Sequence, residues 1–345
     1  MARVECLDQV LSKRGMATMT DVWHRFPGYR TVQGKPRAGE NRSWAPAARP
    51  ARPRLAFAPG VPARADAGRY QRRRRPPGDP FANKRSLYFR EVYAEEGEPF
   101  LAGIQDLLCH PALIDAARAV FGAEVVVPWY VYANVFLPGQ ELSVHTDVPE
   151  FRGLTRHQAP LWLLVVMHHS GLFEPWSVPI ATAVLYVAGC AGGDLTYFAD
   201  GSDGGTRVHP EPNTAVLFDA DTIFHGVDRV SGDDAPLAEL SADACLLRDG
   251  RRSWVLRSRR GADAASLGSY ASEELRYSVS WKALCFADGR DHERWLQHAD
   301  DLDPGEVISR LAGELVERGK LAEGTEVTAR ELAELFIEEF VPFPA

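Results

Sequence analysis

The sequence contains no run of about 18 apolar residues, the length that a membrane-spanning helix requires. Its first stretch, MARVECLDQVLSKRGMATM, lacks the apolar segment of a secretory leader. Five cysteines, at positions 6, 109, 190, 245 and 285, are odd in number and form no CxxC pair. This spacing argues against a disulfide framework and a zinc knuckle. We therefore expect a cytoplasmic protein with no membrane partner.

Charge is unevenly distributed along the 345 residues, whose formal net charge is −8. Residues 1–90 hold 20 Lys and Arg against 6 Asp and Glu, and the remaining residues hold 19 against 41. A basic N-terminal segment followed by an acidic remainder is typical of an arm that binds nucleic acid, or of an arm that packs on the acidic part of its own chain. The run Arg72–Arg75 lacks interleaved aromatic residues, which disfavours a nucleic-acid partner. We expect residues 1–95 to form a basic, Pro- and Arg-rich extension with a short helix around ECLDQVLSKRG.

Two helices and then many strands are predicted after this extension. In residues 97–122, apolar side chains recur every three or four positions, Pro111 separates two helices and Gly122 ends the second. Strands are expected at 124–136, 160–169, 181–189, 193–199, 213–220 and 275–286. Because few helices separate these strands, the pattern favours a sandwich or barrel over a parallel α/β sheet.

Residues 291–345 are again helical in pattern. Two stretches, Asp303–Glu306 and Thr328–Glu331, each place a capping residue and a glutamate ahead of an amphipathic run. We expect these helices to pack on the outside of the sheets. The oligomeric state is left open, with a homodimer as one option.

The stretch SVHTDVPEF (143–151) places His145 and Asp147 on one face of a strand, because side chains alternate with period two. A histidine nitrogen and a carboxylate oxygen suit a divalent metal of intermediate softness. His225, shortly after the apolar run NTAVLFDA, is the best candidate for a third ligand. Two histidines and one carboxylate leave coordination positions open, which is typical of a catalytic rather than a structural site.

Further motifs surround these residues in a fixed order: TAVLYVAGCAGGDLTYF (182–198), VHPEPNTAVLF (208–218) and LRYSVSW (275–281). With His-x-Asp and the distal histidine, they resemble the Fe(II)/2-oxoglutarate-dependent dioxygenases, in their prolyl-hydroxylase-like and phytanoyl-CoA-hydroxylase-like branches. The resemblance covers residues 124–286. It implies a mainly β fold with flanking helices, built on a double-stranded β-helix (jelly-roll, cupin-like) core.

The resemblance implies that Fe(II), 2-oxoglutarate and O2 are the cofactors, with His145, Asp147 and His225 as metal ligands and catalytic residues. It also implies that Arg276 binds the distal carboxylate of 2-oxoglutarate and that Ser278 adds a hydrogen bond. The interval between His225 and Arg276 is 51 residues, longer than is common in the family, so Arg229, Arg248 and Arg257 are rivals, with Arg229 closest in sequence.

The family's tyrosine before the Pro-Gly turn is replaced by Phe136 in this sequence. Tyr132 or Asn134, on the same strand, is expected to take over its contact with 2-oxoglutarate. Residues that we expect near the substrate, with ordinary packing as an equal alternative for each, are Phe151, Arg152, Trp162, Asp194 and Tyr197.

The predicted organisation is an extension (1–95), a dioxygenase domain (96–290) with an inserted lid at about 231–272, and C-terminal helices packed on the core (291–345). The predicted function is hydroxylation, desaturation or cyclisation at an unactivated C–H of a small molecule, such as an amino acid or natural-product intermediate. Succinate and CO2 would be released. Asp147 disfavours halogenation, because halogenating relatives lack this carboxylate. The alternatives are a protein or peptide side-chain hydroxylase and a non-catalytic β-sandwich binding protein with a basic nucleic-acid-binding arm.

Overall fold

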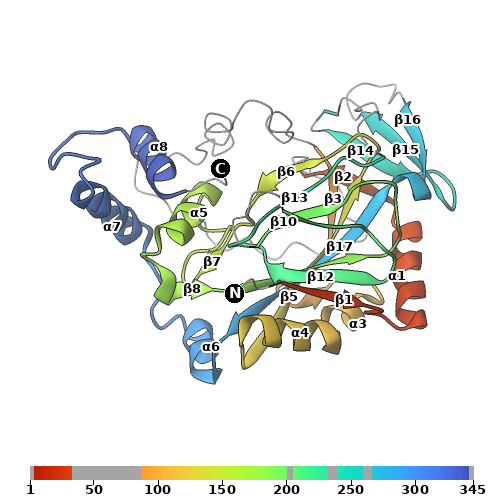
Figure 1. Cartoon of the computed structure of the whole chain (residues 1–345), viewed down its shortest axis with the longest axis horizontal. Coiled ribbons are helices and arrows are strands. Elements are labelled where there is room, and N and C mark those ends of the chain that lie inside the picture. The colour runs from red at the N-terminus through yellow and green to blue at the C-terminus, as the bar shows by residue number, and fades with distance from the viewer. Residues whose placement is uncertain are drawn as a thin grey trace. The chain divides into compact units, whose positions relative to one another are not determined.

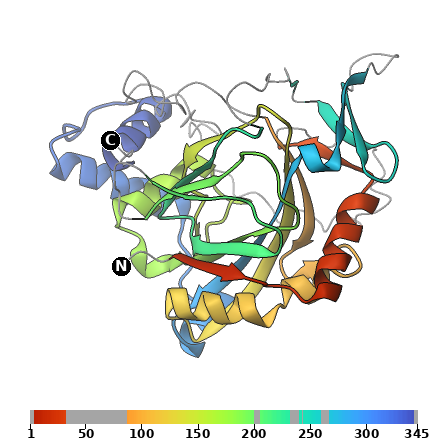
Figure 2. The same ribbon diagram turned by 45° about the vertical axis from the view of Figure 1, so that its right-hand side comes forward.

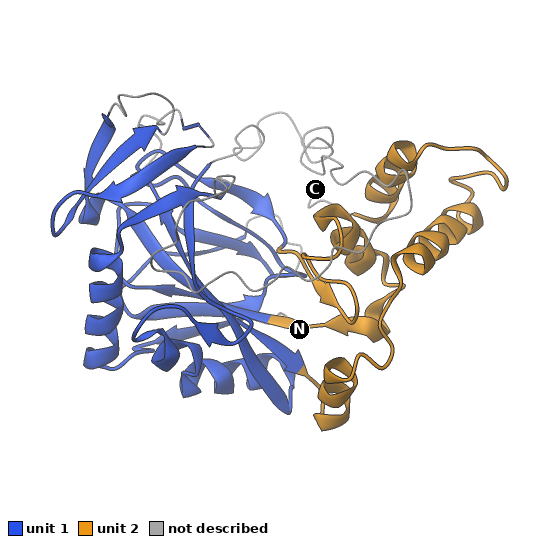
Figure 3. Cartoon of the chain, turned by 180° about the vertical axis from the view of Figure 1, so that it is seen from behind, with its two compact units in different colours: residues 1–47, 84–146, 181–285 blue, residues 48–83, 147–180, 286–345 orange. Residues whose placement is uncertain are grey.

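The computed structural model describes residues 4–32, 87–199, 205–231, 240–241, 243–258 and 266–341. They form two compact units (Figure 3). Unit 1 holds the described parts of 1–47, 84–146 and 181–285, and unit 2 holds those of 147–180 and 286–345. The boundary expected at 95/96 does not separate the units, because unit 1 continues across it. Most of the expected extension, residues 33–86, lies outside the described residues.

One large sheet dominates unit 1 (Figure 1). In spatial order its strands are β1 (Val4–Asp8), β12 (Thr214–Asp219), β9 (Ile180–Tyr186), β17 (Arg276–Phe286), β5 (Val125–Phe136), β3 (Phe89–Glu95), β2 (Gly28–Thr31), β14 (Ala244–Arg248), β15 (Ser253–Ser258) and β16 (Ser266–Ala271), with β4 (Glu98–Pro99) paired to β3. A second, four-stranded sheet has the order β11 (Thr206–Val208), β10 (Leu195–Phe198), β13 (Phe224–Val227) and β6 (Leu142–His145).

The chain passes repeatedly from one sheet of unit 1 to the other. After β5 in the large sheet it enters β6 in the small one, and the same exchange follows from β9 to β10 and from β12 to β13. The central order β12-β9-β17-β5 against β11-β10-β13-β6 is that of a double-stranded β-helix. The predicted jelly-roll core with flanking helices is confirmed.

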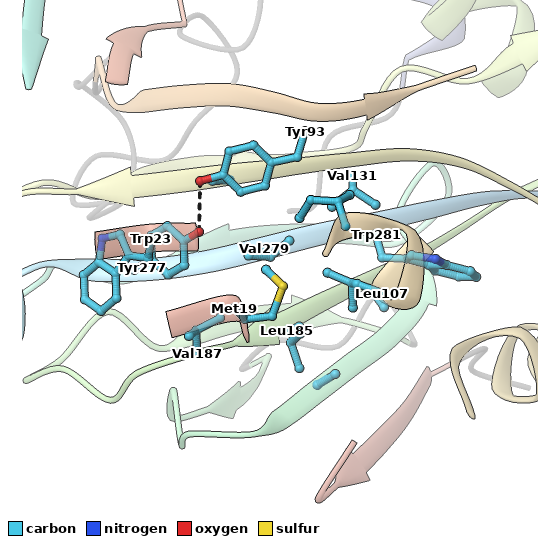
Figure 4. Packing of buried hydrophobic residues seen from close by; sticks show 14 of the residues in the cluster. Met19, Trp23, Tyr93, Leu107, Val131, Leu185, Val187, Tyr277, Val279 and Trp281 are labelled. Atoms are coloured by element: carbon cyan, nitrogen blue, oxygen red, sulfur yellow. Dashed lines mark hydrogen bonds between the residues drawn. The ribbon is translucent and has the colours of Figure 1, made fainter. Parts of the chain in front are cut away.

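The outer face of the large sheet is buried under three helices, α1 (Lys13–Arg25), α3 (Ile104–Leu108) and α4 (Pro111–Phe121) (Figures 1 and 2). As predicted, Pro111 begins α4 and Gly122 ends it, with a positive φ of 62° that suits glycine. The side chains of Tyr277, Val279 and Trp281 alternate onto this face (Figure 4). The Trp281 indole N–H donates to the carbonyl of Leu108 at 2.7 Å, which ties α3 to the sheet.

The inner face of the large sheet looks toward the small sheet through two separate apolar clusters. One joins Tyr186 and Phe218 of the large sheet to Leu195 and Tyr197 of β10. The other joins Tyr88 and Phe136 to Val227 and Val230 around β13. Between these clusters run the inward-facing residues of β17, which are mostly polar and are taken up below.

Two secondary-structure predictions were wrong. Residues 160–169, expected as a strand, form the helix α5 (Leu161–Ser170). Its apolar side chains surround the helix axis, so the run carries no periodicity that separates a buried helix from a buried strand. The helix expected around ECLDQVLSKRG begins only at Lys13, capped by the Ser12 hydroxyl, while residues 4–8 form the edge strand β1, which pairs with β12.

The predicted insert at 231–272 contains β14, β15 and β16, which extend the large sheet from β2 as an antiparallel meander. Trp254 and Leu256 of β15 are buried in the main core. Residues 232–239, 242 and 259–265 of the insert lie outside the described residues. The described strands therefore belong to the sheet, and their expected action as a lid stays a prediction.

Unit 2 has its own hydrophobic core, built from α5, α7 (Pro304–Glu317) and α8 (Ala329–Phe340). The predicted caps are present: Asp303 accepts from the backbone of α7, and Thr328 and Glu331 form a capping box on α8. These helices pack on α5, which supplies the apolar surface that they cover; their expected packing on the outside of the sheets stays a prediction. The remaining elements of this unit are β7 (Glu150–Phe151), β8 (Ser177–Val178), η1 (Glu174–Trp176) and α6 (Gly289–Leu296), whereas η2 (Ser272–Glu274) lies in unit 1.

Among the described helices, none combines the length and the apolar character that crossing a bilayer requires.

Three tyrosines on different strands share one buried hydrogen-bond network in unit 1. The Tyr93 hydroxyl lies 2.8 Å from that of Tyr29 and 3.0 Å from that of Tyr277. Trp23 stacks on the Tyr277 ring with centroids 4.5 Å apart (Figure 4). Burial raises the pKa of all three hydroxyls above the ordinary tyrosine value, so they stay protonated.

Tyr93→Phe removes the central hydroxyl and deprives both neighbours of a buried partner. We expect the free energy of unfolding, measured by urea denaturation, to fall by about 1–3 kcal/mol. The half-buried Tyr270 gives the control Tyr270→Phe, which should change it by less than about 0.5 kcal/mol. Equal effects of the two substitutions would contradict a structural role for the network.

Candidate metal centre

The two histidines of the predicted metal site lie opposite each other on paired strands. β13 runs antiparallel to β6, and His225 is the direct partner of His145. The ring centroids are 4.5 Å apart. Gly226 permits this pairing, because a Cβ there would lie 2.7 Å from the backbone oxygen of Leu142. The register shifts just after His225, between it and Val227.

Asp147 completes a three-residue group that could hold a metal ion. Ligand atoms of His145, Asp147 and His225 all lie within 4.8 Å of one another. Asp147 is assigned to unit 2, but only Thr146 separates it from His145, so the chain itself keeps the two close. The donor set of two imidazoles and one carboxylate suits a divalent transition metal with coordination positions left open.

Backbone carbonyls orient both imidazole rings. Nδ1 of His145 lies 2.8 Å from the carbonyl oxygen of Ser143, and Nδ1 of His225 lies 2.9 Å from that of Ile223. A carbonyl oxygen only accepts, so each Nδ1 carries the proton and each Nε2 carries the lone pair. This is the tautomer that a metal requires, fixed before any metal binds.

Two aromatic side chains flank His225 from different strands. The Phe218 ring of β12 meets the imidazole edge-on at 4.9 Å. Tyr197, one of the expected substrate residues, is the direct β10 partner of His225 and is buried. The candidate centre thus lies between the sheets rather than on the outer surface of the small sheet.

Arg276 and Ser278, the expected 2-oxoglutarate residues, point inward from β17. Arg276 is 2% exposed; its Nε donates to the Gly193 carbonyl at 2.6 Å and one terminal nitrogen donates to the Ser278 hydroxyl at 3.1 Å. Its other terminal nitrogen is buried and has no hydrogen-bond partner. A buried guanidinium nitrogen without an acceptor is costly, which marks this position as one that an anion would stabilise.

Gly193, in the GGDL motif, makes room for Arg276. A Cβ at Gly193 would lie 2.8 Å from Cδ of Arg276, and the φ of +69° also favours glycine. The rival Arg229 contacts Gly193 through its backbone: the Arg229 carbonyl accepts from the Gly193 N–H at 3.1 Å. The Arg229 side chain is only half-buried.

Tyr186, on β9, is a polar residue of this region that sequence reasoning missed. The Arg276 guanidinium carbon lies 5.3 Å from the centre of its ring. Its buried hydroxyl lies beside the Arg276 guanidinium and interacts with it, but no well-formed hydrogen bond joins it to any group. Burial raises the pKa of this hydroxyl although its interaction with Arg276 opposes the shift, so it remains a donor. Tyr186 was overlooked because it ends the apolar run TAVLYV. The alternation of side chains along β9, which places Tyr186 on the inner face of the sheet, is the sequence signal that could have identified it.

Tyr132 and Asn134 share the inner face of β5, as expected, and both contact other protein groups. The Asn134 amide donates to the Ser280 hydroxyl at 3.0 Å and its oxygen accepts from Arg90 Nε at 2.9 Å. The Arg90 guanidinium lies over the Tyr132 ring at 4.2 Å. Arg90 is a second inward-facing group that sequence reasoning did not single out.

Three of the other expected substrate residues, Phe151, Arg152 and Trp162, lie in unit 2, and their role stays a prediction. Phe151 and Trp162 are buried in the core of unit 2. The Arg152 guanidinium is also buried, and it bonds Asp300 at 2.7 and 3.0 Å and Asp291 at 3.3 Å, which accounts for its position within that unit. Asp194 lies on the approach to β10 and accepts from His209 at 2.7 Å, at the edge of the small sheet.

Comparisons with known proteins give distant structural matches only. No family model matches the sequence, and no curated protein matches it. Among solved structures, the epimerase SnoN from nogalamycin biosynthesis, described as non-haem and α-ketoglutarate-dependent, is 8% identical, with a TM-score of 0.41 over 82% of this chain and 77% of that one. A 2OG-Fe(II) oxygenase family protein from Burkholderia pseudomallei is 10% identical, with a TM-score of 0.40 over 81% and 85%. HygX from Streptomyces hygroscopicus, with nickel, 2-oxoglutarate and hygromycin B bound, is 10% identical, with a TM-score of 0.38 over 82% and 83%.

These matches are likenesses of fold. Matches at this distance assign neither a reaction nor a substrate, so the chemistry must be argued from the residues of the site itself.

Gly226→Ala should weaken metal binding by at least about tenfold, because the new methyl group would separate β13 from β6 and move His225 away from His145. The measurement is titration with Co(II), followed by visible absorption. Gly313→Ala is the control, since no atom lies within 4 Å of a Cβ there in α7; it should leave metal affinity unchanged and stabilise the fold by about 0.5–1 kcal/mol. Undiminished Co(II) affinity in Gly226→Ala would contradict the pairing argument.

Proposed function

We propose that this protein is an Fe(II)- and 2-oxoglutarate-dependent oxygenase that oxidises an unactivated C–H bond of a small molecule, by hydroxylation or by a related desaturation or cyclisation. The observation that carries the proposal is the buried Arg276 nitrogen without a partner, on the inner face that also looks onto the three-residue metal group.

The donor set and the surrounding residues fit this pair of cofactors. His145, Asp147 and His225 would hold the iron, with both imidazoles already in the required tautomer. When bound, iron and 2-oxoglutarate supply the activation of O2 and the oxidising power for C–H cleavage, with release of succinate and CO2.

The residues around Arg276 fit the distal carboxylate of 2-oxoglutarate. Arg276 offers a charged donor whose orientation is fixed by its bonds to Gly193 and Ser278. The Tyr186 hydroxyl offers a second donor beside it. In this proposal Tyr186, rather than Tyr132 or Asn134, takes the hydroxyl role that the Phe136 replacement leaves open, because both of those residues are engaged with Arg90.

The surroundings also limit how the cofactor is placed. The Phe136 ring lies 5.5 Å from the Arg276 guanidinium carbon, on the side away from Tyr186 on β9, so apolar groups flank the charge and keep water from competing for it. Asp147 keeps a carboxylate in the metal group, which supports oxygenation over halide transfer. A small-molecule substrate is the version of the proposal that we favour over a peptide.

Anaerobic addition of Fe(II) and then 2-oxoglutarate to the metal-free protein should produce a weak visible charge-transfer band that needs both additions. His145→Ala should abolish the band, because one of three ligands is lost. The absence of a band in the folded wild-type protein would overturn the proposed chelate.

Arg276→Met should weaken 2-oxoglutarate binding, measured by titration of the same band, by at least about 100-fold, since removing a buried charge partner costs about 3–5 kcal/mol. Tyr186→Phe should weaken it by about tenfold, the loss of one hydrogen bond of about 1.5 kcal/mol. Arg229→Met tests the rival arginine and should leave the affinity unchanged. A larger effect from Arg229→Met than from Arg276→Met would reassign the carboxylate site.

A further inference from the structure

Thr182 is a buried polar residue on β9 to which neither the fold nor the proposed cofactors give a role. Its side chain is 2% exposed, and among the described residues its hydroxyl has no hydrogen-bond partner. A buried hydroxyl without a partner costs free energy, and a valine of the same shape would avoid that cost. The position therefore points to a hydrogen bond with a bound molecule rather than to packing.

The Thr182 side chain points to the inner face of the large sheet, because side chains alternate along a strand. Ala181 and Ala183 belong to the outer core under the helices. Val184 and Tyr186 belong to the cluster that faces the small sheet. Thr182 has the parity of Val184 and Tyr186, so its hydroxyl faces the space between the two sheets.

Phe218 connects Thr182 to the candidate metal group. Thr182 and Phe218 are direct partners on β9 and β12, so their side chains lie next to each other on the inner face. The Phe218 ring in turn meets the His225 imidazole edge-on at 4.9 Å. Only one side chain therefore separates Thr182 from a candidate metal ligand.

The proposed cosubstrate does not use this hydroxyl. The distal carboxylate of 2-oxoglutarate is assigned to Arg276, which lies beside Tyr186 toward the other end of β9. Four residues of strand separate Tyr186 from Thr182, a distance of about 13 Å. A five-carbon dicarboxylate is about half as long. The Thr182 hydroxyl is therefore left for a second molecule, which in the proposed reaction is the substrate.

The neighbours of Thr182 indicate what kind of group it would bind. Phe218 lies opposite it, and Val184 is the next inward residue along β9. A hydroxyl next to apolar side chains suits a carbonyl or hydroxyl oxygen on an otherwise apolar part of a ligand. A site that hydrogen-bonds such an oxygen discriminates against analogues that lack it.

We infer that Thr182 is a specificity-determining residue, whose hydroxyl donates a hydrogen bond to a neutral oxygen of a partly apolar substrate held beside the metal group. This inference rests on the proposed function. It narrows the substrate from any small molecule to one with a carbonyl or hydroxyl oxygen near the oxidised carbon.

The first measurement is thermal unfolding of the full chain without ligands. Thr182→Val keeps the shape of the side chain and removes the unpartnered hydroxyl, so the melting temperature should stay the same or rise by up to about 3 °C. Thr196→Val is the matched control. Thr196 is 3% exposed and its hydroxyl donates to Asp228 Oδ1 at 3.0 Å, so its loss should lower the melting temperature. A fall in Thr182→Val as well would mean that its hydroxyl bonds a protein group or a buried water, which would overturn the inference.

The second measurement uses the full chain loaded with Zn(II) and 2-oxoglutarate, so that no turnover occurs. The probes are ketones paired with alkenes of the same shape: cyclohexanone with methylenecyclohexane, cyclopentanone with methylenecyclopentane, and acetophenone with α-methylstyrene. Ligand-observed NMR measures the affinity of each. Thr182→Val should lower the affinity of the ketones relative to their alkenes by at least about fivefold, the loss of one hydrogen bond. Thr182→Ser and Thr196→Val should keep the wild-type ratio.

A ratio that Thr182→Val leaves unchanged, or no binding of any of the ketones to the wild-type protein, would overturn the inference. Failure of the proposed function is distinguishable, since it would appear as a missing Fe(II)–2-oxoglutarate band in the wild type.

Discussion

The backbone pairing of β13 with β6 is the contact on which the candidate centre depends. These two short strands are separated by some eighty residues of chain, and they bring His225 opposite His145 only because Gly226 allows the backbones to approach. The carbonyls of Ser143 and Ile223 then set the ring tautomers. The jelly roll holds this pair against the large sheet through Phe218, so the histidines face the interior.

Burial of charge is the second constraint. Arg276 is kept in a nearly water-free interior by a carbonyl and a hydroxyl, and neither neutralises it. Such an arrangement is costly in the empty protein and becomes favourable when an anion completes it. The same reasoning makes the Arg276 end of the inner face the place where an anion would be most stabilised.

Much of the fold and of the site followed from local sequence pattern. Hydrophobic runs that end at Gly, Pro and Asp predicted the strands at 124–136, 181–189, 193–199, 213–220 and 275–286. The caps of α7 and α8 could be predicted because the residues that form each cap lie within four consecutive positions. His145 and Asp147 were found because two ligands on one strand face would leave a spacing of two, although β6 ends at His145 and Asp147 lies just beyond it. Arg276 and Ser278 share that spacing on β17.

What sequence could not show depends on distant packing. α5 is apolar all round because α7 and α8, more than a hundred residues later, cover it, and no periodicity distinguishes it from a strand. Arg152 looked like a substrate residue beside the metal motif, but its partners Asp291 and Asp300 lie in the C-terminal part of unit 2. Tyr186 and Arg90 became visible only when strand pairing placed them beside Arg276 and Asn134.

The measurement that tests the central claim most directly is the fate of 2-oxoglutarate itself. The metal-free protein, supplied with Fe(II), O2 and 2-oxoglutarate labelled with ¹³C at the carboxylate next to the keto group, should release labelled CO2 and form an equal amount of succinate. His225→Ala should form neither. Formation of no succinate by a folded, iron-loaded wild-type protein, or the same amount by His225→Ala, would contradict the account.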